Sequence, residues 1–271
     1  MGLFSKLFGS KQAHKKEIEN EFGKENTSLP KTDLKRDFDE ICKGAIIPFF
    51  KEFGFKRNVL HFTRQINDIT QCFNVQKSQW NSYNDSITFT FNFGFYNADI
   101  SSIVADKEIQ NIFPKTYDCF IQNRLGIFSH NRDHWYTLSK NIDATKTAEQ
   151  IKYDLEKYLK PIFEDYTSLE TLKLFLNKEE KYISPTLSPY YLIAFYMLTN
   201  QIDKGRQTIK EHYKKALTPQ TVTDTINFPD GRQEIKTKTY VNQYYIDSIE
   251  RLAKKYNFEL EQTKTQAGNN S

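Results

Sequence analysis

The segment His130-Asn131-Arg132-Asp133-His134 holds the closest grouping of side chains that could do chemistry. Two imidazoles and a carboxylate within five residues are ligand types that zinc accepts. Arg124 lies shortly before them and could bind an anion or form an ion pair. The local sequence is that of a polar turn, and no distant third ligand is marked. A hydrolase-type enzyme with a metal at the His130/His134 turn is therefore the alternative hypothesis, and we predict neither a metal nor another cofactor.

Other catalytic patterns are missing from the sequence. It has no phosphate-cradling glycine loop, no nucleophile elbow and no HExxH helix. The three cysteines, Cys42, Cys72 and Cys119, form no CxxC motif, and their odd number argues against a disulfide framework. Reduced thiols are typical of a cytoplasmic protein. The sequence favours a cytoplasmic, non-catalytic protein.

The element that must position any site is an alternating strand from Ile87 to Phe95. Ile87, Phe89, Phe91, Phe93 and Phe95 alternate with threonine, asparagine and glycine. A period of two puts the rings on one face of a sheet and the polar side chains on the other. This pattern is typical of a half-buried antiparallel strand.

A hairpin turn at Asn67-Asp68 sets the register of the two preceding strands. Folding the chain there pairs Phe62 with Phe73 on the apolar face and His61 with Asn74 on the polar face. The polar face then carries short, uncharged hydrogen-bonding side chains: His61, Thr63, Gln65, Asn74, Gln76, Ser78, Thr88, Thr90 and Asn92.

This polar face is the candidate recognition surface for an unknown protein partner. It lacks the Lys and Glu residues that usually cover a solvated sheet face, and Trp80 adds an aromatic anchor of the kind enriched at interfaces. A merely solvated face is the competing interpretation. The candidate binding residues are Asn74, Gln76, Ser78, Trp80, His61, Thr90 and Arg124.

Several short motifs resemble a known family. They are the run from Ile46 to Arg57 (IIPFFKEFGFKR), Phe62-Thr63-Arg64, the run from Phe73 to Ser78 (FNVQKS) and Phe91-Asn92-Phe93-Gly94. In order and spacing they resemble the bacterial domain-of-unknown-function family 4304, over about residues 34–176. The family has no established activity, so the resemblance implies a fold and leaves function open. An association of some relatives with toxin-immunity genes makes an immunity-like role one form of the interaction hypothesis.

The remaining pattern predicts an α+β fold: an antiparallel sheet with helices packed on one face, plus a C-terminal helical extension. The expected units are a flexible N-terminus (1–32), the α+β domain (33–178), the extension (185–258) and a disordered tail (259–271). Helices are expected from Asp33 to Gly54 with a kink near Pro48, from a capping box at Thr147, and over Ser168–Leu176. Helices are also expected after Ser188, over 204–217 and over 241–256. Residues 218–239 look loop-like, with a hairpin turn at Asp230-Gly231.

Charge and the N-terminal sequence bear on partners. The net charge of +4 is spread along the chain, and the rings fall on the predicted core face, so both argue against nucleic acid. Leu3, Phe4, Leu7 and Phe8 would share one helical face beside Lys6. Such a segment predicts weak peripheral contact with an anionic membrane, and a structureless terminus is the competing interpretation.

Overall fold

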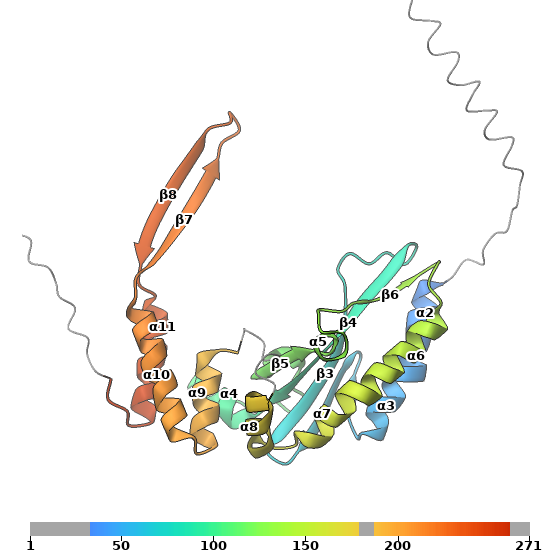
Figure 1. Cartoon of the computed structure of the whole chain (residues 1–271), viewed down its shortest axis with the longest axis horizontal. Helices are drawn as coiled ribbons and strands as arrows, with labels where there is room; N and C mark the ends of the chain where they lie inside the picture. Colours follow the sequence, from blue (N-terminus) through green and yellow to red (C-terminus); the bar gives the residue numbers. More distant parts are fainter. Residues whose placement is uncertain (1–32, 179–186, 261–271) are drawn as a thin grey trace, which may run out of the picture.

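The computed structural model describes residues 33–178 and 187–260, and it shows an α+β fold as expected (Figure 1). The predictions for residues 1–32 and 261–271 fall outside the described residues. None of the helices in the described ranges combines the length and the apolar character needed to cross a bilayer.

The main sheet is antiparallel and has six strands. Its order is β1-β2-β3-β4-β5, and β6 pairs with the same central strand, β4. The strands are β1 (Lys56–Asn58), β2 (His61–Ile66), β3 (Ile69–Lys77), β4 (Ser86–Tyr96), β5 (Ile121–Arg124) and β6 (Tyr136–Ser139). β5 pairs with the second half of β4, and β6 pairs with its first half. The segment between β5 and β6, residues 125–135, therefore leaves and rejoins the sheet beside the middle of β4; we call this segment the excursion.

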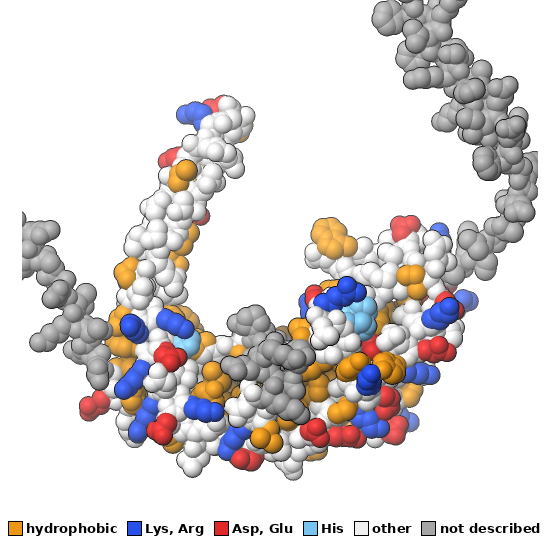
Figure 2. All heavy atoms as spheres, in the orientation of Figure 1, with side chains coloured by type: hydrophobic (Ala, Val, Ile, Leu, Met, Phe, Trp, Pro, Cys, Tyr) orange, Lys and Arg blue, Asp and Glu red, His pale blue; other side chains and the backbone are white. Residues whose placement is uncertain are grey.

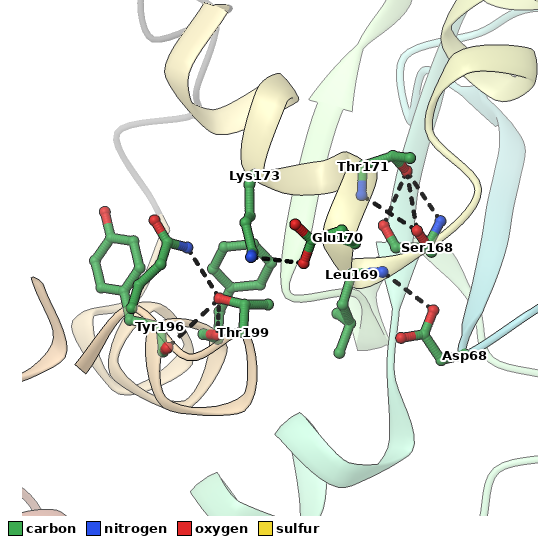
Figure 3. Close-up of polar contacts among 10 residues, drawn as sticks. Asp68, Ser168, Leu169, Glu170, Thr171, Lys173, Tyr196 and Thr199 are labelled. Atoms are coloured by element: carbon green, nitrogen blue, oxygen red, sulfur yellow. Dashed lines mark hydrogen bonds and ion pairs between the residues drawn. The ribbon is translucent and has the colours of Figure 1, made fainter.

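The predicted register is confirmed. Phe62 lies opposite Phe73, His61 lies opposite Asn74, and Asn67 at the turn has a φ of 48°. The turn also serves a helix: the Leu169 backbone N–H donates to Asp68 Oδ1 at 3.1 Å, and Ser168 and Thr171 complete the capping of this helix (Figure 3).

Helices cover the aromatic face of the sheet, as expected (Figure 1). They are α2 (Leu34–Ile41), α3 (Ile47–Glu52), α6 (Ala144–Asp154), α7 (Lys160–Asp165) and α8 (Leu169–Lys178). Side chains from these helices and the five alternating residues of β4 form one buried cluster. The rings contact each other directly; Phe50 of α3, for example, lies 4.2 Å from Phe73 of β3 between ring centroids.

Two π-helical turns in the described residues lie just before prolines. The turns Cys42–Ile46 and Leu155–Leu159 are π-helical, and each lies just before Pro48 or Pro161. Proline lacks the N–H and crowds the preceding turn, so the helix widens there instead of ending. The predicted start at Thr147 is wrong: α6 begins at Ala144, because Asp143 accepts the Thr145 N–H at 2.8 Å and caps the helix.

The polar face of the sheet is only partly open to solvent. After α4 (Ala98–Ala105), the chain returns across this face to β5 through a short 3-10 turn, Thr116–Asp118. Cys72, Tyr96 and Cys119 are buried together beneath this crossing. All three cysteines of the chain are buried free thiols, and burial raises the pKa of Cys42 to about 11.

The C-terminal region is helical with one unexpected feature. α9 (Pro189–Leu198), α10 (Ile202–Leu217) and α11 (Gln243–Lys255) share a second apolar cluster. The hairpin turn predicted at Asp230-Gly231 is confirmed, but the residues on either side of it, expected to be loop-like, form the regular strands β7 (Gln220–Asn227) and β8 (Gln233–Tyr240). The hairpin projects away from the helices (Figure 1). The strands were hard to see in the sequence, because most threonines lie opposite threonines and the lysines lie opposite Val222 and Asp224, which leaves no continuous apolar face like that of a half-buried strand.

The close crossing over the sheet predicts that Gly94→Ala destabilises the fold. A Cβ at Gly94 would lie 2.5 Å from the Ile121 carbonyl oxygen and 2.8 Å from Cys119 Cβ. Overpacking of this kind costs about 1–3 kcal/mol, measurable by urea unfolding. Gly44→Ala is the control, because a Cβ there has open space. Equal effects of the two substitutions would contradict this reading of the crossing.

Candidate functional site

Four side chains form a row across the open part of the polar face. His61 lies opposite Asn74, Asn74 opposite Asn92, and Asn92 opposite Arg124, so the row crosses β2, β3, β4 and β5. All four are partly exposed. Directly opposed residues in an antiparallel sheet share a face and lie close enough to interact. The sheet register therefore gathers three of the predicted binding residues, with Asn92 between them.

Hydrogen bonds hold the centre of this row in place. Asn92 Nδ2 donates to Asn74 Oδ1 at 3.1 Å and to Gln76 Oε1 at 2.9 Å. Thr116 from the crossing segment donates its hydroxyl to Asn74 Oδ1 at 2.9 Å. Within the described residues, Asn74 Nδ2, Gln76 Nε2 and Asn92 Oδ1 keep no protein partner. Together with Gln76, the row thus offers two amide nitrogens as donors and one amide oxygen as an acceptor in fixed positions.

His61 contributes a neutral imidazole at one end of the row. Burial, and then the positive charge of Lys115, lower the pKa of His61. Its Nδ1 is buried and has no hydrogen-bond partner among the described residues. At neutral pH this ring adds no charge to the surface.

Arg124 at the other end is already paired. Asp133 forms an ion pair with its guanidinium, which also lies 5.2 Å from the centre of the Trp135 ring. Trp135 Nε1 donates to the same Asp133 carboxylate at 3.3 Å. Asp133 therefore serves Arg124 and Trp135 and does not join the two histidines. Of the two interpretations given for Arg124, the ion pair is the one seen.

The other predicted binding residues are placed differently. Thr90 is fully buried, and its hydroxyl donates to the His134 backbone oxygen at 2.8 Å, so its assignment to a binding surface is wrong. Ser78 accepts the Trp80 N–H at 3.2 Å, near the β3–β4 turn. Trp80 is 85% exposed. At about 3.3 Å of strand per residue, Trp80 stands beyond the row rather than within it.

The two histidines form a separate cluster on the excursion between β5 and β6. The helix α5 (Leu125–His130) and the following loop bring the His130 and His134 rings together, stacked with centroids 3.7 Å apart. Ser129 Oγ lies 2.7 Å from His130 Nδ1. His130 Nε2 lies 3.9 Å from Asp154 Oδ2, beyond hydrogen-bond range.

Asp154 is the buried centre of this cluster. It is 1% exposed and accepts hydrogen bonds from the Tyr136 hydroxyl at 2.5 Å and from Gln150 Nε2 at 2.9 Å. Burial, and then the bond to Asp154, raise the pKa of Tyr136, which keeps its phenol protonated. The bonds join α6 to β6. Sequence reasoning missed Asp154, although a carboxylate beside Ile151 and Leu155 interrupts the apolar stripe of that helix.

The cluster contains the side-chain types of two kinds of active site. Serine, histidine and aspartate are present, but the carboxylate is occupied by Tyr136 and Gln150 and does not orient the imidazole closely. Within the described residues, no group of three His, Cys, Asp or Glu side chains is arranged to hold a metal ion. The hydrogen bonds of this cluster connect α6 to β6, which is a structural role.

Comparison with known proteins identifies a family for part of the chain. Residues 46–165 match the model of a domain of unknown function (DUF4304). The chain therefore contains a DUF4304 domain, which confirms the family suggested by the short motifs. The match includes the whole main sheet and ends with α7, before α8 to α11 and the β7–β8 hairpin. No curated protein and no solved structure matches the chain.

The stacked histidines predict acid sensitivity. Burial, and then the charge of His130, lower the pKa of His134 below its ordinary value of 6.5. The unfolded chain therefore takes up this proton first, and the free energy of unfolding falls as the pH drops below about 6.5. His134→Phe, which keeps a ring in the stack, should make that fall shallower in urea titrations at several pH values. An unchanged pH profile would contradict this assignment.

The buried hydrogen bond from Tyr136 to Asp154 predicts a second effect on stability. Tyr136→Phe leaves the Asp154 carboxylate without its closest donor and should lower the free energy of unfolding by about 1–3 kcal/mol. Tyr153→Phe is the matched control, because Tyr153 is half-exposed on the same helix as Asp154. Loss of stability in both variants alike would show that the buried bond has no special role.

Proposed function

We propose that the chain is a non-catalytic protein-interaction module of the bacterial cytoplasm, and that its recognition surface is the polar row. We define the polar row as the four opposed side chains His61, Asn74, Asn92 and Arg124, together with Gln76, which accepts a hydrogen bond from Asn92. The observation that supports this proposal is the set of unused amide donors and acceptors that hydrogen bonds hold in fixed positions on a rigid sheet. Pre-organised groups of this kind lose little side-chain entropy on binding.

A folded protein or peptide is the class of partner that the row suits best. The side-chain amides of the polar row keep groups that have no hydrogen-bond partner among the described residues. Amides complement the peptide groups and polar side chains of another protein. Arg124, the cation of the row, is paired with Asp133, so the row offers little attraction for phosphate. Trp80 follows the C-terminal end of β3, the end at which Gln76 lies. It supplies a large exposed ring of the kind that anchors protein interfaces. Neutralising a partner, as an immunity protein does, is one form of this function.

The proposal predicts that Gln76→Ala/Trp80→Ala loses a partner without losing the fold. Wild type and the double variant would be used for affinity purification from an extract of the source organism, with mass spectrometry of the bound proteins. A partner enriched with wild type should fall by about tenfold or more with the variant, because truncated anchor residues cost about 2 kcal/mol or more.

The matched control is Gln207→Ala/Tyr244→Ala. It removes the same kinds of exposed side chain from α10 and α11. The control should retain the partner. Loss of the partner with both double variants, or with neither, would contradict binding through the polar row.

A hydrolase remains a second candidate, supported by the 2.7 Å contact between Ser129 Oγ and His130 Nδ1. Its test is hydrolysis of ester and peptide substrates by the purified chain, with and without added zinc, beside Ser129→Ala and His130→Ala. Activity lost in either variant would favour the enzyme over the interaction module.

Weak membrane contact through residues 2–16 is a further alternative, which rests on the apolar and basic pattern of that segment. Sedimentation with anionic liposomes, comparing the full chain with one lacking residues 2–16, decides it. Binding that survives the deletion would overturn this alternative.

A further inference from the structure

The β7–β8 hairpin, which we call the arm, packs little against the other elements of the described residues. Every residue of both strands is exposed. Figures 1 and 2 show the arm standing clear of the helices that carry it. A lone two-stranded hairpin is marginally stable in water, and each of its edges presents unpaired backbone groups. An arm of this length therefore needs a partner along one edge, and its function is separate from that of the polar row.

The charges of the arm restrict what that partner is. Residues 220–240 contain three acidic side chains (Asp224, Asp230 and Glu234) and three basic ones (Arg232, Lys236 and Lys238). The arm is therefore neutral and has no electrostatic attraction for nucleic acid or an anionic membrane. An acidic and a basic side chain lie close together on β8. An identical strand running antiparallel can therefore place its basic side chain opposite the acidic one, and the reverse.

We propose that the arm pairs with the arm of a second copy of this chain through β8, antiparallel, with Ile235 opposite Ile235 of the partner subunit. Such a pairing has two-fold symmetry, so each contact occurs twice. Glu234 then faces the partner's Lys236, and Lys236 faces the partner's Glu234. Opposite charges directly across an antiparallel ladder are stabilising.

The neighbouring residues fit the same register. Ile235 is 68% exposed in the single chain, and it would be covered at the symmetry axis. Within the arm, Lys236 already lies opposite Asp224 of β7 and 3.4 Å from the Glu234 carboxylate of its own strand, and the pairing adds the partner's Glu234 on its other side. Lys238 would face the partner's Arg232, whose charge is taken up by a 2.7 Å ion pair with Asp230 of its own chain.

The free edge of β7 does not offer an equivalent pairing. Asp224 is the one charged residue of that strand, so symmetric pairing through β7 gains no reciprocal ion pair. Shifting the β8 register by one pair would place Lys236 opposite its own copy. Edge lysines of this sort normally prevent strand pairing. Self-recognition through Glu234 and Lys236 is therefore specific to one register.

Charge reversal tests this proposal on the full chain. Analytical ultracentrifugation over a range of concentrations should show a dimer for wild type. Glu234→Lys or Lys236→Glu alone places like charges together twice and should weaken the dimer by about tenfold or more. A mixture of the two single variants should form a heterodimer, and the double variant Glu234→Lys/Lys236→Glu should recover the homodimer. Thr223→Lys, which adds charge on β7, is the control and should dimerise as wild type does.

Cross-linking gives a second readout that does not depend on affinity. The three native cysteines are buried, so Ile235→Cys introduces a single exposed thiol. Directly opposed cysteines on paired strands come within disulfide range, and mild oxidation should join two chains through this residue. Thr225→Cys on β7 should not be joined. A monomeric wild type, a dimer indifferent to both charge reversals, or equal cross-linking at both positions would overturn the proposal.

Discussion

Packing of the phenylalanine stripe of β4 against the helices is the interaction on which the rest of the structure depends. Phe89, Phe91, Phe93 and Phe95 are fully buried, and rings from neighbouring strands and helices contact them. Each buried ring removes a large apolar area from water and contributes a few kcal/mol. Because side chains alternate along a strand, burying this stripe fixes which residues of β4 face outward. The position of Asn92, and through it the polar row, follows from that alternation.

Other segments of the chain cover parts of the outward, polar face of the sheet, and the rest of that face is open to solvent. The chain crosses it after α4 and buries Cys72 with Cys119, and the excursion around His134 covers Thr90. Between these covers, Asn74 and Asn92 stay partly open and bind one another. Covering two parts of the face makes the strands rigid where the row is exposed. The row is therefore a set of partly exposed polar groups that hydrogen bonds connect between two covered parts of the face.

The sequence predicted the parts of the fold that depend on periodicity and local turn chemistry. The turn at Asn67-Asp68 was enough for the register of β2 and β3, and that register is confirmed. The alternation from Ile87 to Phe95 was enough to predict which side chains of β4 are buried in the apolar core. The cover over Thr90 could not be predicted, because it depends on a backbone contact from residue 134, far along the chain. The strands of the arm, unlike its turn, were missed for another reason: most threonines lie opposite threonines and the lysines lie opposite Val222 and Asp224, so no continuous apolar face marks the strands. Asp154 shows a third kind of miss, since its partners Tyr136 and Gln150 become neighbours only when α6 packs on β6.

Site-specific photo-cross-linking from the polar row in living cells of the source organism tests the central claim most directly. A photoreactive residue at Gln76 reports what touches the row, and the same residue at Gln207 reports the surface of α10. The account predicts one discrete adduct with another protein from position 76 and none from position 207. The same adducts from both positions, or none from position 76, would contradict a recognition role for the row.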